Sequence, residues 1–110
     1  MIRISFKHND SGEPIAFRCE GHAGFARKGR DIVCAAVSIL TLNTVNSIEE
    51  FTEDPFLLDH NEDTGYMFFR FGDDVTPSAD SILLLKSMEM GITCIAQEHK
   101  GFIKLTEWEV

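Results

Sequence analysis

The chain has 110 residues, of which 44% are hydrophobic and 25% are charged, and its formal net charge is −8. This length and composition predict an ordinary globular domain over residues 1–110 and leave little room for a second one. The excess of acidic side chains argues against a nucleic-acid binder, which needs Lys and Arg contacts to phosphates. It either attracts basic peptides as partners or only keeps the protein soluble.

The first half of the chain predicts a β-hairpin followed by a helix. Apolar and polar residues alternate over 2–7, turn-forming residues occupy 9–12, and alternation resumes over Pro14–Glu20. Residues 23–30 combine glycines with basic side chains and predict a loop. Asp31 then has the character of a helix N-cap, and a helix is expected from Ile32 to about Phe51. Its first half is apolar nearly all round, which predicts a central, buried helix.

The second half predicts another hairpin, a helix and a last strand. These elements are expected over residues 55–60, 65–71, 78 or 80 to about 99, and 102–108. Gly91, inside the second helix, indicates close packing or a bend. The order ββαββαβ predicts an α+β fold: a two-layer sandwich of a mostly antiparallel sheet and two helices.

Two further features predict a cytoplasmic protein that does not contact a membrane. No apolar run approaches the ~20 residues needed to span a bilayer, and the first residues lack the apolar centre of a signal peptide. The three cysteines, Cys19, Cys34 and Cys94, form an odd set without paired spacing. Such a set suits a reducing compartment better than a disulfide scaffold.

A histidine and a cysteine flank the predicted loop. His22 follows the second strand, and Cys34 falls in the first turn of the predicted helix. A free thiol has a pKa near ~8.5, and the helix dipole, typically worth about 0.3–1 kcal/mol, lowers it by less than one unit. A cationic imidazole in contact lowers it much further. We therefore predict a small cysteine hydrolase in which His22 takes the thiol proton and the Cys34 thiolate is the nucleophile.

The neighbours of this pair suggest supporting roles. Asp31 either caps the helix or orients His22, and Ser38 lies one helical turn beyond Cys34, where its hydroxyl can donate to the site. Backbone N–H groups at the helix start, including that of Cys34, are expected to hold the oxyanion. The loop over 24–30 either closes over bound peptide and excludes water or is a plain solvent-exposed connection. This chemistry needs no cofactor and no metal.

Residues 21–24 and 29–38 together resemble the signature of the ribosomal-processing cysteine proteases called Prp. The site residues that the resemblance implies are the catalytic pair His22 and Cys34 and the supporting positions Gly21, Asp31 and Ser38. The resemblance also implies the substrate, which is the short N-terminal extension of a protein of the large ribosomal subunit, cut after a pair of phenylalanines ahead of a basic stretch. Members of the family are dimers, so a homodimer is expected.

Two other classes of function remain open. One is a non-catalytic, ribosome-associated binding or assembly factor that grips a basic ribosomal protein without cutting it. The other is a redox-sensing thiol at Cys34, which requires a resolving cysteine close by. The sequence does not show whether Cys19 or Cys94 is near enough.

The remaining chemistry-bearing residues have simpler interpretations. Cys19 with His22, and Cys94 with His99, have the spacing of half a zinc site, but Cys19 falls on an apolar strand face. Cys94 is expected to pack in the core. The aromatic run Phe68, Phe69 and Phe71 suits a half-buried strand, with a pocket for substrate phenylalanines as the alternative. The histidines near turns or element ends are expected to be solvated: His8, His60 and His99.

Overall fold

The computed structural model describes residues 1–21 and 28–109 and follows the predicted order of elements. These elements are β1 (Ile2–His8), β2 (Pro14–Glu20), α1 (Lys28–Phe51), β3 (Phe56–Asn61), β4 (Tyr66–Phe71), α2 (Ala79–Glu98) and β5 (Ile103–Thr106). The predicted order ββαββαβ and the α+β class are confirmed. The last strand is shorter than predicted, because it ends at Thr106.

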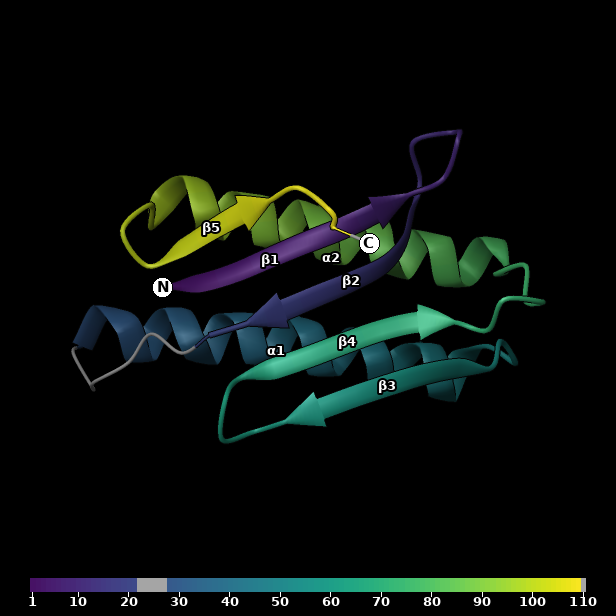
Figure 1. The fold of residues 1–110 in the computed structure, drawn as a ribbon, viewed down its shortest axis with the longest axis horizontal. Helices are drawn as coiled ribbons and strands as arrows, with labels where there is room; N and C mark the ends of the chain where they lie inside the picture. Colours follow the sequence, from purple (N-terminus) through teal and green to yellow (C-terminus); the bar gives the residue numbers. More distant parts are fainter. Residues whose placement is uncertain (22–27, 110) are drawn as a thin grey trace.

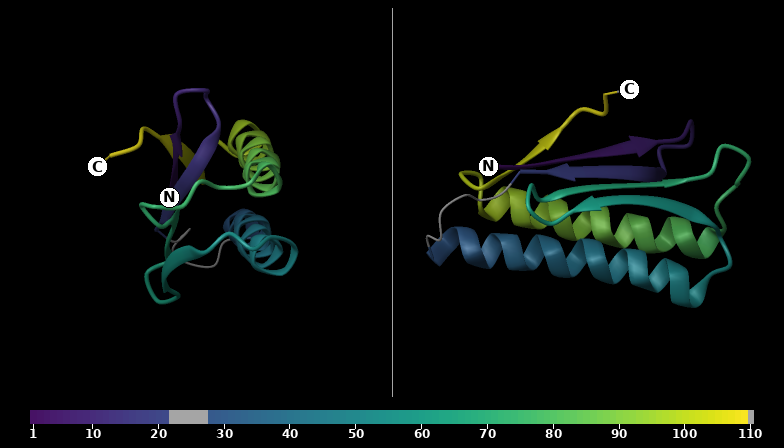
Figure 2. Two further views of the ribbon diagram at one scale, coloured as in Figure 1. Left: turned by 90° about the vertical axis from the view of Figure 1, so that its right-hand side faces the viewer. Right: turned by 60° about the horizontal axis from the view of Figure 1, so that its bottom comes forward.

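The five strands form one sheet in the order β3-β4-β2-β1-β5 (Figure 1). Neighbouring strands are antiparallel except β1 and β5, which run parallel at one edge. Figure 2 shows both helices on the same face of this sheet, so the predicted two-layer sandwich is confirmed. Within residues 1–21 and 28–109, no helix covers the other face of the sheet.

The hydrophobic core lies between the sheet and the helices. Every second residue of each central strand points into it, so Ile4, Phe17 and Phe69 are fully buried. Phe17 and Phe69 face each other across β2 and β4, and their rings stack with centroids 5.4 Å apart. Gly91 of α2 faces Leu40 of α1, and a methyl group at Gly91 would lie 3.1 Å from the Leu40 side chain. The predicted close packing at this glycine is therefore confirmed.

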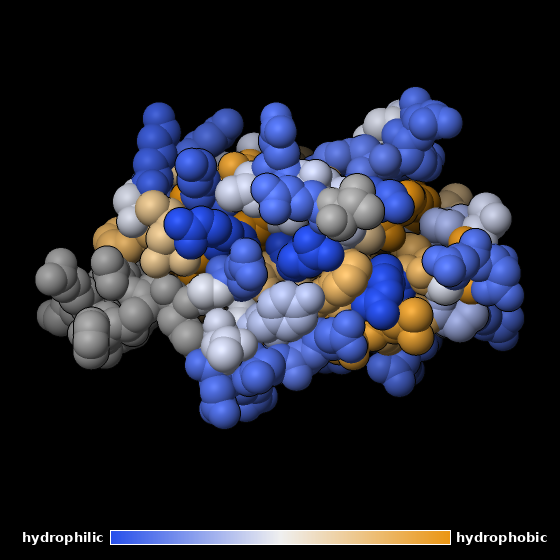
Figure 3. Space-filling view, in the orientation of Figure 1, coloured by the Kyte–Doolittle hydropathy of each residue, from blue (hydrophilic) through white to orange (hydrophobic). Residues whose placement is uncertain are grey.

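The uncovered face of the sheet is largely hydrophilic (Figure 3). The Arg18 guanidinium lies 4.5 Å from the ring centre of Phe68 and 4.8 Å from that of Trp108. The Arg70 guanidinium also lies close to Phe68, 4.4 Å from its ring centre, and pairs with Asp59 at 3.1 Å. Phe68 and Phe69 therefore point to opposite faces of β4, as the alternation of a half-buried strand requires.

Helix α1 differs from its prediction at its start and in its burial. It begins at Lys28, so residues 28–30 are helical rather than part of a loop, and Asp31 is not the N-cap. The outer side chains Ile32 and Ile39 are 65% and 68% exposed, so the expectation of a helix buried all round is wrong. Because both helices share one face of the sheet, each buries only one stripe of side chains. The fully packed positions of α1 include Val33 and Val37.

The segment Ile32–Phe51 also corrects the expectation that no apolar run reaches membrane-spanning length. Among the described residues, this segment is the one helix that is both long enough and apolar enough to cross a bilayer, and its mean hydropathy is 1.5. One such helix is weak evidence for a membrane span, since the core helix of a folded domain passes the same test. In this fold, the segment packs one stripe of its side chains against the sheet and α2.

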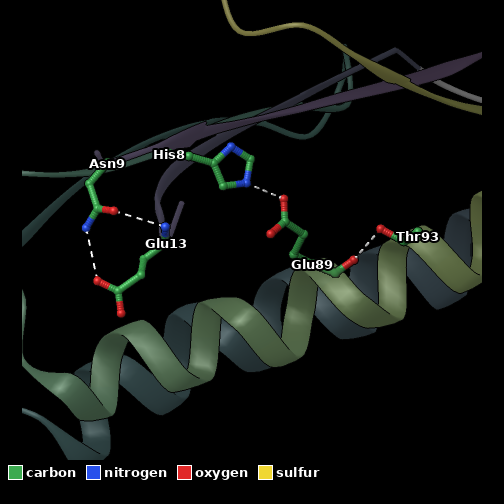
Figure 4. Close-up of polar contacts among 5 residues, drawn as sticks. All are labelled: His8, Asn9, Glu13, Glu89 and Thr93. Carbon is green, nitrogen blue, oxygen red and sulfur yellow. Dashed lines mark hydrogen bonds and ion pairs between the residues drawn. The ribbon is translucent and has the colours of Figure 1, made fainter. Parts of the chain in front are cut away.

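The histidine at the end of β1 is not simply solvated. His8 Nε2 lies 2.7 Å from the Glu89 carboxylate of α2, and this pair joins the sheet to the helical layer (Figure 4). In the adjoining turn, Asn9 accepts a hydrogen bond from the Glu13 N–H and donates one to the Glu13 side chain. The hairpin between β1 and β2 is thereby fixed next to α2.

A carboxylate organises the start of α2. Ser78 is the N-cap of this helix and accepts a hydrogen bond from the Ser81 N–H. The Asp54 carboxylate accepts from the Ser78 hydroxyl at 2.6 Å, from the Ser78 N–H at 2.9 Å, and from the Ser81 hydroxyl. These hydrogen bonds, led by that of the Ser78 hydroxyl, hold the pKa of Asp54 below its ordinary value.

Asp54→Asn is expected to reduce stability at neutral pH but not in acid. Because the folded-state pKa of Asp54 is lowered, its contribution is complete above the unfolded value of ~3.9 and is lost as the pH falls through the folded value. We expect a loss of about 1 kcal/mol or less at pH 7, since the carboxylate is partly exposed. Urea unfolding of both proteins at pH 7 and near pH 2 measures this. Asp10→Asn, in an exposed turn, is the control, and a deficit that persists in acid would contradict the linkage.

Candidate active site

Cys34 lines a cavity of about 240 Å³ between α1 and the β3–β4 hairpin. Three parts of the fold contribute its walls. Its lining residues are Cys34, Val37, Ser38, Thr41 and Leu42 from α1, Ile2, Cys19 and Gly21 from the region of β1 and β2, and His60, Glu62, Gly65, Tyr66 and Met67 from the hairpin. The structure therefore brings together three of the predicted site residues: Cys34, Ser38 and Gly21.

The wall from α1 is one face of the helix. Positions 34, 37, 38, 41 and 42 follow the three- and four-residue spacing that places side chains on one side. Thr41 donates its hydroxyl to the Val37 carbonyl at 2.9 Å and so has no proton left for a ligand. Ser38 is exposed, and its hydroxyl forms no hydrogen bond within the described part of the chain. The Ser38 hydroxyl therefore stays available at this wall, and its donation to a bound group remains a prediction.

Gly21 shapes the wall at the end of β2. Its φ is +91°, which L side chains rarely adopt, and a Cβ placed there would lie 2.5 Å from the Met1 carbonyl oxygen. Only a glycine fits here, because the backbone of residue 21 crosses directly over that of Met1. The glycine of the motif therefore has a local structural reason.

The hairpin wall could not be anticipated from the local sequence. It adds the apolar surfaces of Tyr66 and Met67 and the polar groups of His60 and Glu62. His60 is exposed, but it also borders the cavity of Cys34, so its interpretation as merely solvated is incomplete. Among the described residues that line the cavity, Glu62 is the only acid and none is Lys or Arg. The described lining therefore combines apolar side chains with one carboxylate, that of Glu62.

The position of Cys34 in its helix corrects part of the predicted chemistry. Because α1 begins at Lys28, Cys34 is in the second turn rather than the first. The field of a helix terminus falls off within one turn, so it supports the thiolate less than expected. In such a helix the N–H groups without intrahelical partners lie at its very start and extend no further than residue 30. The Cys34 N–H is therefore not a free oxyanion donor in this conformation.

Several predictions concern residues that the structure does not describe or places elsewhere. His22 lies outside the described residues, as does the side chain of Asp31, so the contact of His22 with Cys34 and the orienting role of Asp31 remain predictions. A pocket for substrate phenylalanines is the alternative interpretation of Phe68, Phe69 and Phe71, and none of these residues lines the Cys34 cavity. Within the described part of the chain, no three or more His, Cys, Asp or Glu residues are grouped to hold a metal ion.

The two other cysteines have contrasting environments. Cys94 is exposed on α2, so the expectation that it packs in the core is wrong. Cys19 is buried beneath the cavity that Cys34 lines. Burial raises the pKa of the Cys19 thiol to about 12, and the negative charges of Cys34 and Glu20 contribute further. Cys19 is therefore protonated at neutral pH and is a poor first nucleophile.

Comparisons with known proteins point to one family. Residues 1–104 match the family model described as cysteine protease Prp. The chain is 31% identical to the ribosomal processing cysteine protease Prp of Bacillus subtilis over 108 residues, 96% of each chain. It is 29% identical to the Prp of Staphylococcus aureus over 105 residues, which is 96% of this chain and 97% of that one.

Solved structures show the same architecture. The chain superposes on the S. aureus Prp protease in complex with a substrate peptide with a TM-score of 0.87 and 27% identity, covering 98% of this chain and all of that one. It also resembles SMU.848 from Streptococcus mutans, with a TM-score of 0.85 and 30% identity over 97% of this chain and 93% of that one.

Proposed function

Because the chain belongs to the Prp family of cysteine proteases, we propose that it removes the short N-terminal extension of a large-subunit ribosomal protein. The observation that carries this proposal is the Cys34 cavity, which a partly exposed thiol shares with apolar side chains and the carboxylate of Glu62. Such a cavity suits a peptide with a large apolar side chain beside the scissile bond and basic residues beyond it. We place the reaction in the cytoplasm, where the cysteines stay reduced.

The mechanism assigns one role to each motif residue. His22 takes the Cys34 proton, and the thiolate attacks the scissile carbonyl carbon to form a carbon–sulfur bond. The carbon–nitrogen bond then breaks, and the imidazolium gives its proton to the leaving amine. A water molecule, deprotonated by His22, attacks the thioester and releases the second product and the thiol. Ser38 donates to the site from the helix wall, and Asp31 orients His22.

The test is cleavage of a peptide that copies the extension, with its phenylalanine pair and the basic residues that follow. Mass spectrometry of the products shows whether the wild-type protein cuts once and after which residue. A single cut after the phenylalanine pair supports the proposal. A peptide that binds but stays intact would instead favour the non-catalytic binding or assembly factor, and a peptide that neither binds nor is cut would overturn both.

Glu62 is expected to favour a basic residue in this substrate. Its carboxylate is exposed at the cavity and forms no ion pair within the described residues, so a substrate Lys or Arg can pair with it. An exposed pair is worth up to about 1 kcal/mol, so Glu62→Gln should lower kcat/KM about threefold to fivefold. For a peptide with norleucine in place of each Lys, wild type and Glu62→Gln should have the same kcat/KM.

The control for this prediction is Glu49→Gln, which removes an exposed carboxylate of α1 that does not line the cavity. It should leave kcat/KM unchanged for both peptides. Glu62→Lys extends the series, because it should reverse the preference toward peptides with acidic residues at the same positions. Equal losses on the basic and the norleucine peptide would show that Glu62 acts on the fold rather than on substrate charge.

We also propose that the protein is a homodimer that pairs through its helical layer. Exposed apolar side chains recur at a spacing of seven on both helices, as Ile32 and Ile39 of α1 and as Leu83 and Met90 of α2, each 65–68% exposed. Burying such a stripe against a second copy removes apolar surface from water. Sedimentation velocity should show a dimer for wild type and a monomer for Ile39→Lys. Leu57→Lys, on strand β3, should remain dimeric, and dimers of both variants would exclude this surface.

A further inference from the structure

We infer that Cys19 is the resolving thiol of Cys34, so that a hydroperoxide converts the two side chains into a reversible disulfide that switches the nucleophile off. Cys19, which has no role in the proteolytic mechanism, is thereby assigned as a site of oxidative modification. The inference concerns the thiol pair itself and does not depend on the substrate of the protease.

The placement of the two thiols carries this inference. Cys19 lies on the inner face of β2, where its neighbours on the adjacent strands are Ile4 of β1 and Met67 of β4. Cys34 comes from α1 and packs against the same hydrophobic cluster that contains Cys19. Both side chains line the one cavity of about 240 Å³. Strand β2 of the sheet and helix α1 of the helical layer thus bring their cysteines to the same cavity.

The electrostatics of the pair agree with this proximity. The charge of Cys34 is the second largest cause of the raised pKa of Cys19, after burial and ahead of Glu20, the next residue in the chain. The electrostatic effect of one charge on another weakens with distance. The third thiol differs, because Cys94 is exposed on α2 and is not among the residues that line the cavity. Cys94 therefore offers a matched cysteine that should not take part.

The environments also fix the order of the reaction. Cys34 is partly exposed and faces the cavity, whereas Cys19 is only 8% exposed. A hydroperoxide that enters the cavity meets Cys34 first. Its thiolate attacks the outer peroxide oxygen, the O–O bond breaks, and Cys34 becomes a sulfenic acid while the oxidant leaves as an alcohol or water.

The second step joins the two sulfurs. The Cys19 sulfur attacks the Cys34 sulfenic sulfur, the S–O bond breaks, and water leaves with the Cys19 proton. Because the pKa of Cys19 is about 12, little of it is thiolate at neutral pH and this step is the slow one. The disulfide removes the Cys34 nucleophile and occupies the cavity wall. A dithiol reductant breaks the bond by exchange and restores both thiols.

The experiment treats the reduced, full-length protein with a small excess of hydrogen peroxide and follows it by intact mass and by peptide mapping under non-reducing conditions. The variants are Cys19→Ala, with Cys19→Met as a second replacement that keeps the core filled, and Cys94→Ser as the control. Each protein is compared with its own untreated sample, so that a lower starting activity does not enter the result. Circular dichroism confirms that each variant is folded.

Wild type and Cys94→Ser should both lose two hydrogen atoms, yield a linked Cys19–Cys34 peptide, and regain their thiols with dithiothreitol. In the Cys19 variants, Cys34 should instead accumulate sulfinic and sulfonic acids that dithiothreitol does not reverse. A wild-type protein that gains oxygen on Cys34 without forming the link would overturn the inference. So would a linked peptide that contains Cys94. Since mass reports the bond directly, this result stands whether or not the ribosomal peptide is cleaved.

Discussion

Cys34→Ala is expected to abolish peptide cleavage while the protein stays folded. The side chain is partly exposed at the cavity wall and packs only at the margin of the core, so its loss removes the nucleophile but little packing. Removing the nucleophile of a hydrolase typically lowers turnover by about 10⁴-fold or more. Initial rates of peptide cleavage measure the loss, and thermal unfolding monitors the fold. An active Cys34→Ala protein would move the nucleophile elsewhere.

Two companion variants separate the roles of the dyad. Cys34→Ser keeps the size of the side chain, but its hydroxyl is a far weaker acid than a thiol, so it should be nearly as inactive as alanine. His22→Ala should lower the rate about 10²- to 10⁴-fold, the usual worth of a positioned acid–base group, and should remove the limb of the pH–rate profile that reports its titration. Cys94→Ser, a change at an exposed cysteine on α2, should retain full activity. A normal pH profile in His22→Ala would assign the base to another residue, and His60 is the first to replace because it borders the cavity.

Gly21→Ala is expected to cause the largest loss of stability among replacements of the glycines whose surroundings the structure describes. The alanine must adopt a φ of +91° and its methyl group would lie 2.5 Å from the Met1 carbonyl oxygen, which belongs to backbone and cannot swing away. The left-handed conformation alone costs about 1–2 kcal/mol, and the clash adds to it, so we expect a total above about 2 kcal/mol. Urea unfolding gives the free energy, and the cleavage rate should fall as well because Gly21 lines the cavity.

Two other glycines allow the causes to be separated. Gly12 also has a positive φ, of +78°, but a Cβ there meets nothing within 4 Å. Gly12→Ala should therefore cost about 1 kcal/mol from backbone strain alone. Gly101 has neither a positive φ nor a close neighbour, and Gly101→Ala should be nearly neutral. If Gly21→Ala and Gly12→Ala cost the same, the close approach to Met1 carries no energetic weight.

Periodicity by itself determined the order and type of the elements. Period-two alternation marks the inner face of β1 and β2, and the helical stripe of α2 marks its buried side, because these patterns record which face of an element meets the core. The motif predicted the site residues, and helical spacing alone places neighbours such as Ser38 on the same helix face as Cys34. Even Thr41 and Leu42 could have been found in this way.

Local signals misplaced the start and the exposure of α1. Asp31 has the side chain of a good N-cap, but the helix already begins at Lys28, because a cap preference is a weak local term that the rest of the chain overrides. The apolar composition of the first half suggested full burial. Only the packing of both helices on one face of the sheet decided that Ile32 and Ile39 face outward.

The remaining parts of the site are long-range and were decided by tertiary structure alone. Strand β4 pairs with β2 so that Met67 lies opposite Cys19, and this register places the hairpin residues His60 and Glu62 beside the cavity of Cys34. Neither residue is near Cys34 in the chain, so no spacing rule could connect them. The sequence by itself predicts Cys34 as the reacting thiol. The tertiary structure decided that Cys34 shares its cavity with the Glu62 carboxylate, the apolar side chains of the hairpin and a second thiol, Cys19. These groups are distant from Cys34 in the sequence, and strand pairing and helix packing bring them together.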